Sequence, residues 1–355
     1  GCENLTSVTI NSEVTAIYDY AFYGCSSLTA FTIPTSTTSI GSYAFYNNTA
    51  LATLNFNSKV TSIGDYAFYG TTSLKEMTLP SELTTIGSNA FNGTRVRSLT
   101  IPSKVTSIGD NAFANVATLT SLTIPGNVTY IGEGAFSGCG NIATLTLNSG
   151  IKTIGSKAFK DFAITTVVVP NTVTSIGSGA FQGCNSLTSI TLPFVGGNSS
   201  VTSYNPYSSY IEDSQLFGYI FGSTTTSGTS NGTNLVYQGQ SSSSGYRKYY
   251  IPSSLKTVTI TNATGISAYA FYGCENLTSV TINSEVTAIY NYAFYNCLSL
   301  TAFTIPTSTT GIGSYAFYNN TALATLNFNS KVTSIGDNAF EGCSSLTSIV
   351  IPDSV

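Results

Sequence analysis

The chain has little charge, no histidine and no tryptophan. Its 355 residues include 12 Lys and Arg and 16 Asp and Glu, so that 8% are charged, whereas an ordinary soluble domain carries about 25%. The net charge of −4 leaves no basic surface for nucleic acid or anionic lipid. The lack of histidine removes the usual general base near neutral pH and the commonest metal ligand. We therefore expect no nucleic-acid partner, no cofactor and no bound metal.

Long apolar segments and paired carboxylates are also lacking. No stretch is long and apolar enough to span a bilayer, so we expect no membrane insertion. Asp and Glu occur singly, without the carboxylate pair used in glycoside hydrolysis. The segment 228–232 matches G-x-S-x-G, but no predicted strand precedes it and no histidine could activate its serine. The sequence therefore predicts a protein that is not an enzyme.

The sequence contains an internal repeat of 22 or 23 residues. Its clearest mark is the dipeptide Ala-Phe, whose phenylalanines are Phe22, Phe45, Phe68, Phe91, Phe113, Phe136, Phe159, Phe181, Phe271, Phe294, Phe317 and Phe340. Successive marks lie 22 or 23 residues apart, except for one step of 90. Such a period indicates one supersecondary unit per repeat, stacked on its neighbours because each unit is too small to bury its own apolar face.

Each repeat is predicted to begin with a short strand. The consensus L-T-S-L-T-I-P-x-x-V-T-S-I-G-x-x-A-F-x-G-C-x-S opens with L-x-x-L-x-L, and fourteen copies can be placed. The last two apolar residues of that opening alternate with Thr or Ser, which is the period of a strand with one buried face. Proline follows the strand in eight copies, as at Pro34 and Pro80, and ends the pairing because it cannot donate to a ladder.

The second half of the repeat, with the pattern I-G-x-x-A-F, is predicted to be a bend followed by one helical turn. Asp65, like Ser42 and Asp110, is a candidate N-cap for that turn. The glycine before it suggests a tight bend, but tyrosine replaces this glycine at Tyr18 and Tyr290. A strictly positive φ is therefore not expected at that glycine position.

A strand, a bend and a short helical turn every 23 residues describe an α/β leucine-rich-repeat solenoid. A parallel β-sheet would form one face, and short helical or 3-10 turns the other. The variant I-G-x-x-A-F-x-G-C resembles the BspA-like leucine-rich repeat family, which comprises surface proteins of mucosal bacteria and some protists. The resemblance covers residues 1–193 and 255–355 and implies an extracellular or cell-surface location. Because Pro and Val fill the stretch where many leucine-rich repeats carry Asn, we expect no asparagine ladder.

Three parts of the chain differ in their regularity. Residues 1–193 form a first array of repeats, residues 194–254 an irregular insert rich in Ser, Thr, Gly and Tyr, and residues 255–355 a second array. Residues 273–337 duplicate residues 1–65 with four differences. The chain begins and stops inside a repeat, so we expect a fragment of a longer array, with any signal peptide and anchor outside it.

The insert is predicted to keep one relaxed repeat, because Ser214–Phe217 reads Ser-x-Leu-Phe in place of Ser-x-Ala-Phe. Residues 224–232 and 238–245 are predicted to be disordered linkers, and 235–238 to pair with 246–251 as a hairpin. The insert also supplies candidate interface anchors, because aromatic residues are enriched at such positions. These are Tyr204, Tyr207, Tyr210, Tyr219 and Phe221. The alternative is that they pack against neighbouring repeats and fill the interruption.

The outward residues of the predicted strands form rows of threonine and asparagine with almost no charge. The candidate binding residues in these rows are Thr32, Asn55, Thr78, Thr100, Thr123 and Thr146. Such a face could bind an extended glycan or a partner protein through many weak hydrogen bonds. The alternative is that threonine merely suits an exposed strand.

Tyrosine is abundant because the turn often reads Tyr-Ala-Phe-Tyr, as at Tyr20, Tyr43, Tyr66, Tyr292 and Tyr315. Two interpretations stay open. The rings either pack partly between repeats or form an aromatic strip on which glycans stack.

Seven cysteines occupy one position of the repeat, where other copies carry residues as different as Val116 and Phe162. This indicates a semi-buried filler. Two pairs, Cys2/Cys25 and Cys274/Cys297, fall in adjacent repeats about 5 Å apart, but their parallel side chains suit a disulfide poorly. We therefore predict seven thiols, with a bridge in either pair as the alternative.

Together these observations predict a non-enzymatic adhesion or ligand-binding repeat protein, secreted or at the cell surface. Its partner would be a host or matrix protein or a glycan, read either by the strand face or by the insert. The alternative is a structural spacer or a self-assembling surface stalk, which associates with its own copies and has no specific ligand.

Overall fold

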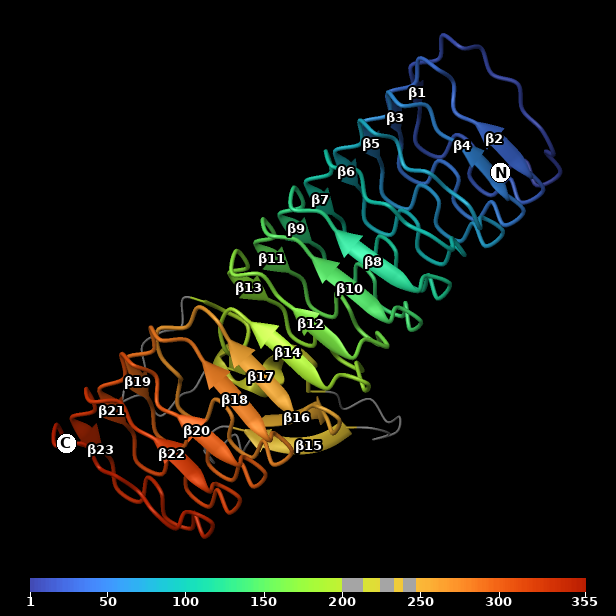
Figure 1. The fold of residues 1–355 in the computed structure, drawn as a ribbon. Helices are drawn as coiled ribbons and strands as arrows, with labels where there is room; N and C mark the ends of the chain where they lie inside the picture. Colours follow the sequence, from blue (N-terminus) through green and yellow to red (C-terminus); the bar gives the residue numbers. More distant parts are fainter. Residues whose placement is uncertain (200–212, 224–232, 239–246) are drawn as a thin grey trace. The chain divides into compact units, whose positions relative to one another are not determined.

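The computed structural model describes residues 1–199, 213–223, 233–238 and 247–355, in two compact units, Gly1–Ile164 and Thr165–Val355 (Figure 1). Each unit is a solenoid of short parallel strands. A strand residue pairs with its equivalent one repeat away, as Ala30 does with Thr53 and Ala302 with Thr325. The leucine-rich-repeat solenoid predicted from the sequence is therefore confirmed.

The first unit contains a parallel sheet that the sequence analysis did not predict. It is built from the T-S-I part of each repeat, and we call it the short-strand sheet. Its strands, in spatial order, are β1 (Ala16–Ile17), β3 (Ser39–Ile40), β5 (Ser62–Ile63), β6 (Thr85–Ile86), β7 (Ser107–Ile108), β9 (Tyr130–Ile131) and β11 (Thr153–Ile154). In each strand the isoleucine is buried and the residue before it is more exposed.

The predicted L-x-x-L-x-L strands of the first unit pair in two places. β2 (Ala30–Thr32) pairs with β4 (Thr53–Asn55), and β8 (Ser121–Ile124) pairs with β10 (Thr144–Leu147). Residues 76–79 and 98–101 lie in the described part of the chain but form no strand. The strand prediction is therefore wrong for these two repeats, and the ladder on this face is interrupted between β4 and β8. It is also wrong at both ends of the chain, because residues 7–10 and 348–351 form no strand.

The second unit continues its strands past the insert. Four strands form one sheet in the order β12 (Thr166–Val168), β14 (Ser189–Leu192), β17 (Thr257–Ile260) and β18 (Ser279–Ile282), followed by the pair β20 (Ala302–Thr304) and β22 (Thr325–Asn327). Ser189 pairs with Thr257 and Leu192 with Ile260, although 68 residues separate each pair in sequence. The insert therefore leaves the strand ladder intact.

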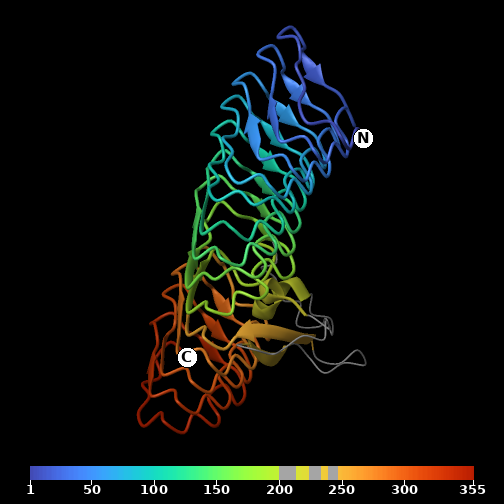
Figure 2. The same ribbon diagram turned by 90° about the vertical axis from the view of Figure 1, so that its right-hand side faces the viewer.

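Short strands recur in this unit and the insert lies beside them. The short strands are β13 (Ser175–Ile176), β19 (Ala288–Ile289), β21 (Gly311–Ile312) and β23 (Ser334–Ile335), of which the last three pair in that order. Figure 2 shows that the described part of the insert projects to one side of the second unit.

The Ala-Phe segments are hydrogen-bonded turns rather than helical turns. Among the described residues the helices are two 3-10 helices of the insert, η1 (Asp213–Gln215) and η2 (Phe217–Phe221). The N-cap prediction is also corrected. The carboxylate of Asp65 accepts a hydrogen bond from the backbone N–H of Ser88 at 2.7 Å, and Asp110 likewise from Glu133 at 2.8 Å. The reason is that stacking brings the N–H of the next repeat within reach, so the side chain links two repeats.

A column of phenylalanine rings fills the interior of each unit. The rings of Phe68, Phe91 and Phe113 are fully buried and stack with centroids 5.2 Å apart and planes within 8°. Phe271 and Phe294 stack in the same way at 5.1 Å in the second unit. The backbone follows the rings, because the N–H of Phe45 donates to the carbonyl of Ala67 at 2.7 Å. The phenylalanine of each turn therefore contacts the phenylalanine of the next turn.

Threonine hydroxyls bridge successive repeats next to the short-strand sheet. The hydroxyl of Thr84 donates to the carbonyl of Thr61 at 2.9 Å, and that of Thr333 to Thr310 at 3.1 Å. Asparagine side chains also bridge repeats, as Asn115 does by donating to Asn92 at 3.0 Å. The amide of Asn57 donates to the carbonyls of Pro34 and Thr37 in the preceding repeat. The hydroxyl bonds of Thr84 and Thr333 explain why the V-T-S-I segment of the repeat keeps its threonine.

None of the seven cysteines, all in the described part of the chain, forms a disulfide. All are buried except Cys2, which is exposed. The thiol of Cys139 donates to the carbonyl of Phe113 at 3.2 Å, and that of Cys297 to Phe271 at 3.3 Å. Burial raises the pKa of the Cys139 thiol to about 12. A buried thiol of this kind is a packing residue rather than a reactive one.

No helix in the described ranges has both the length and the apolarity needed to cross a bilayer.

We expect Phe113→Ala to lower the free energy of unfolding by about 3–5 kcal/mol, because it opens a cavity in the ring column. Urea unfolding followed by circular dichroism measures this loss. The matched control is Thr100→Ala on the exposed strand face, for which we expect a change within about 0.5 kcal/mol. A loss below about 1 kcal/mol for Phe113→Ala, the typical cost of any substitution, would contradict the role given to the column.

We expect thiol counting without reductant to return one rapid thiol, Cys2, in the native protein and seven in denaturant. The unfolded chain loses its thiol protons near the ordinary pKa of about 8.5, while buried Cys139 keeps its proton to about 12. Between about pH 8.5 and about pH 12 the unfolded state binds fewer protons than the native state. The free energy of unfolding therefore falls as the pH rises through this range. A count of five or three in denaturant would mean that one or both adjacent pairs are bridged.

Candidate functional site

The six candidate residues of the strand face are exposed and lie in the first unit. β2 and β4 bring Thr32 next to Asn55, whose amide donates to the threonine hydroxyl at 3.2 Å. β8 and β10 place Thr123 in register with Thr146. Thr78 and Thr100 lie on the two segments that form no strand. The structure therefore brings the candidates together as neighbouring pairs and not as one row.

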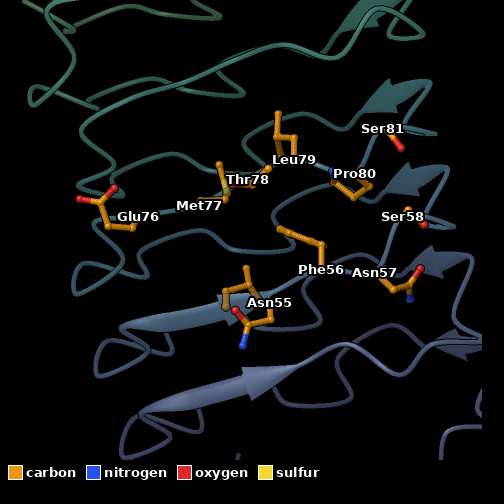
Figure 3. Close-up of a pocket in the computed structure, with 11 residues that line it drawn as sticks. Asn55, Phe56, Asn57, Ser58, Glu76, Met77, Thr78, Leu79, Pro80 and Ser81 are labelled. Atoms are coloured by element: carbon orange, nitrogen blue, oxygen red, sulfur yellow. The ribbon is translucent and has the colours of Figure 1, made fainter.

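A cleft of about 470 Å³ opens where the strand ladder stops after β4 (Figure 3). One wall comes from residues 54–58 and the other from residues 76–81. Two of the predicted residues, Asn55 and Thr78, lie on opposite walls of this cleft. The repeats remain joined elsewhere, because β5 pairs with β6 in the short-strand sheet. The opening is therefore confined to the strand face.

The apolar part of the cleft was not predicted. Phe56 and Met77 occupy strand positions that the repeat pattern assigns to the core, but both are only half-buried and line the opening. Phe56 stands at the position that buried Ile33, the residue directly after β2, occupies one repeat earlier. A phenylalanine ring needs more room than isoleucine, and the larger residue coincides with the interruption of the strand ladder. The only signal in the sequence was the larger residue at this strand position.

The cleft offers hydrogen-bonding groups over an apolar floor. Asn55, Thr78 and the two serines Ser58 and Ser81 supply amide and hydroxyl groups. Glu76 is the one charged residue among the lining residues, all of which are described, and its carboxylate lies 3.9 Å from the Arg97 guanidinium. Such a surface suits a neutral ligand with donors and acceptors of its own, and it holds no nucleophile paired with a base.

A second cleft of about 600 Å³ lies at the equivalent place in the second unit, beside β22. Asn327 and Phe328 repeat Asn55 and Phe56 at the spacing of the duplicated segment, 272 residues later. The other wall differs, because Val350 takes the place of Thr78. The second cleft therefore has the same amide and aromatic ring on one wall, Asn327 and Phe328, and its opposite wall is more apolar than that of the first cleft.

Two of the five candidate anchors of the insert, Tyr219 and Phe221, are described, and both pack against other residues of the protein. Tyr219 is half-buried and lies so close to Gly197 that a Cβ added there would be 2.4 Å from its ring. Phe221 is fully buried and meets Phe217 edge-on at 5.3 Å, so its assignment as an exposed anchor is wrong. The other three candidates, Tyr204, Tyr207 and Tyr210, lie outside the described residues.

Phe217 of the predicted relaxed repeat lies next to the phenylalanine column. Its ring is buried and lies 5.0 Å from that of Phe271, which continues the phenylalanine column. Its N–H donates to the carbonyl of Ala270 at 2.9 Å, which is the bond that links successive turns elsewhere. The insert therefore contributes one turn to the solenoid.

The predicted hairpin is also present, as the antiparallel pair β15 (Thr233–Gln238) and β16 (Arg247–Pro252). Buried Gln238 fastens it to the solenoid. Its side-chain oxygen accepts from the N–H of Gly218 at 2.7 Å, and its amide nitrogen donates to the carbonyls of Ala270 and Tyr272 at 3.2 Å. Apart from Gln238, the predicted linkers 224–232 and 238–245 lie outside the described residues.

Comparisons with known proteins agree with this architecture. A family model described as a BspA type leucine rich repeat region matches residues 1–120, 106–217 and 245–355. No curated protein matches the chain. A leucine-rich repeat protein of Bacteroides ovatus is similar, with 27% identity and a TM-score of 0.56 over 94% of this chain and 81% of that one. A leucine rich cell surface protein of Faecalibacterium prausnitzii has 26% identity and a TM-score of 0.36 over 94% and 82% of the two chains.

We expect Gln238→Leu to lower the free energy of unfolding of the second unit by about 1–3 kcal/mol, because it leaves the buried N–H of Gly218 without a partner. The control is Leu235→Ala on the same strand, where the side chain is exposed. Urea unfolding compares the two variants, and hydrogen exchange of the Gly218 amide localises the effect. Equal losses in both variants would contradict the clamping role of Gln238.

Proposed function

Because the chain belongs to the family of BspA-type leucine-rich repeat proteins, we propose that it is a non-catalytic binding protein whose strand face recognises a partner protein or glycan. The observation that carries the proposal is the cleft at Asn55 and Thr78, which combines amide and hydroxyl groups with an apolar floor. Sites that bind small ligands or chain segments have this composition. The second cleft at Asn327 adds support, since two linked sites raise the affinity for a repeated ligand.

The proposed location is the cell surface or the extracellular medium. Family membership supports this, because the repeats resemble those of surface proteins. A host or matrix protein, or a neutral polysaccharide, is the proposed class of partner. Both classes present the donors and acceptors that a nearly uncharged hydroxyl and amide surface can bond.

The competing function is that of a structural spacer or a stalk that associates with its own copies. In that case the two clefts would be gaps left by uneven stacking, and they would have no ligand. The two functions differ in their response to a change at the cleft.

We expect the double variant Asn55→Arg/Thr78→Arg to weaken binding at least tenfold to the ligand found for the unaltered chain, which corresponds to about 1.4 kcal/mol. The ligand is first found by arraying the chain against matrix proteins, mucins and neutral polysaccharides. Asn127→Arg, on an exposed turn of the same unit, is the control for added charge. No binding to any member of the array, together with self-association in ultracentrifugation, would contradict the proposal and favour the stalk.

A further inference from the structure

Two columns of tyrosine rings run along the turns of each unit, one on either side of the Ala-Phe dipeptide. In the first unit the columns are Tyr20, Tyr43 and Tyr66, and Tyr23, Tyr46 and Tyr69. In the second unit they are Tyr269, Tyr292 and Tyr315, and Tyr272, Tyr295 and Tyr318. Each set of six rings is called a tyrosine platform. The first platform serves as the example below.

The backbone under the first column is in the left-handed region. Tyr20, Tyr43 and Tyr66 have φ of 60°, 58° and 56°. A side chain with a Cβ costs roughly 1–2 kcal/mol per residue in this conformation. In the next two repeats, which have no platform tyrosine, Asn89 and Asn111 occupy the same position with φ of 57° and 54°. Tyrosine therefore stands where asparagine is the ordinary choice.

A second left-handed position of the same turn shows that the chain otherwise follows this preference. Four residues after the first position, each repeat of the first platform carries Gly or Asn, namely Gly24, Asn47 and Gly70. Tyrosine is tolerated only in the position where it joins a column. The tyrosines are thus placed against local backbone preference, and strain of this kind marks candidate functional positions.

The faces of the rings are covered by one another. Tyr20 and Tyr43 stack with centroids 5.0 Å apart and planes at 4°, and Tyr43 and Tyr66 at 4.7 Å and 6°. Stacking contributes about 0.5–1.5 kcal/mol per pair, which is comparable to the backbone strain. The faces are therefore not free to stack on sugar rings, so this geometry favours the packing interpretation over the glycan strip. What the platform offers outward is ring edges and hydroxyls.

The Tyr43 hydroxyl is a hydrogen-bond donor, and the charged residues around the first platform are acidic. Partial burial, then the neighbouring hydroxyls of Tyr66 and Tyr20, and finally Asp65, raise the pKa of Tyr43, so its hydroxyl keeps its proton and can donate. Across the turn segments 14–26, 37–49 and 60–72, the charged residues are Asp19 and Asp65. Each carboxylate is exposed and uses one oxygen for a backbone N–H, of Ser42 or Ser88. The platform therefore favours a ligand that carries positive charge.

We propose that the first tyrosine platform binds a polyproline II segment of a partner protein, one that is rich in proline and carries lysine or arginine. Two steps of the first column, 5.0 and 4.7 Å, match one turn of a polyproline II helix, which is roughly 9.3 Å long. An extended strand places same-side residues about 6.6–6.8 Å apart, which matches neither one step nor two. A polyproline II helix has no internal hydrogen bonds, so its carbonyls can accept from the tyrosine hydroxyls.

This site is separate from the cleft of the strand face, so it does not depend on the function proposed above. Its partner is a protein segment, and its recognition elements are the hydroxyl rows, the ring edges and the border carboxylates. The three-repeat platform spans about one turn of the ligand, so a single platform binds weakly.

The test uses the full chain and a fluorescent synthetic peptide of Pro-Pro-Arg triplets, with binding followed by anisotropy. A peptide of Ala-Ala-Arg triplets has the same charge without the polyproline II preference. We expect saturable binding of the first peptide and at least tenfold weaker binding of the second. Absence of binding, or equal binding of both peptides, would overturn the proposal.

Variants then locate the site. One set changes Tyr20, Tyr43 and Tyr66 to asparagine, the residue that the fold already carries at Asn89 and Asn111, and we expect at least a tenfold loss. A second set changes them to phenylalanine, which keeps the stacking and removes the hydroxyls, and we expect a smaller loss. Tyr130→Phe, at an exposed tyrosine outside the platforms, is the control. Thermal unfolding checks that the variants fold. If the asparagine variant does not fold, binding by the phenylalanine variant decides whether the proposal holds.

Full binding of the peptide by both variant sets would overturn the proposal. The proposal would also be overturned if a neutral β-glucan oligosaccharide displaced the peptide bound to the unaltered chain. Loss of peptide binding in the tyrosine variants, with unchanged ligand binding at the Asn55 cleft, is the supporting result. Because peptide binding and ligand binding at the Asn55 cleft are measured separately, the experiment distinguishes an error in the platform proposal from an error in the proposed strand-face function.

Discussion

Stacking of equivalent turns is the constraint on which the rest of this structure depends. A repeat of 22 or 23 residues is too short to bury its apolar residues or to pair its own backbone groups. The N–H of Phe45 therefore donates to Ala67 in the next repeat, and Thr84 to Thr61 in the preceding one. Every turn is completed by its neighbours, and a residue type placed once per repeat contacts its own copies along a column.

This constraint decides what each column can contain. Phenylalanine suits the interior because flat rings stack at the spacing of the turns, as Phe68, Phe91 and Phe113 do. The same spacing lets Tyr20, Tyr43 and Tyr66 stack at the surface and compensates for their left-handed backbone. The column and the backbone preference conflict at these tyrosines, and there the array acquires a surface that the neighbouring repeats at Asn89 and Asn111 lack.

Departures from even stacking are the other source of distinct surfaces. Larger residues at Phe56 and Met77 accompany the opening of the strand face, while the short-strand sheet stays closed at β5 and β6. The insert departs differently. It adds a turn through Phe217 and a hairpin held by Gln238, yet leaves β14 in register with β17. A repeat protein can thus vary locally without losing the ladders that stabilise it.

The sequence by itself determined the period, the fold class and the exposure of Thr32 and its counterparts. These follow because a repeated pattern assigns each residue to a column with one environment. Tertiary structure alone decided the short-strand sheet, since strands of two residues are too short to show alternation. It also decided the left-handed tyrosines, the inter-repeat bond of Asp65 and the cleft between Asn55 and Thr78. Each of these depends on the distance between residues about one repeat apart, and only the stacked backbone sets that distance.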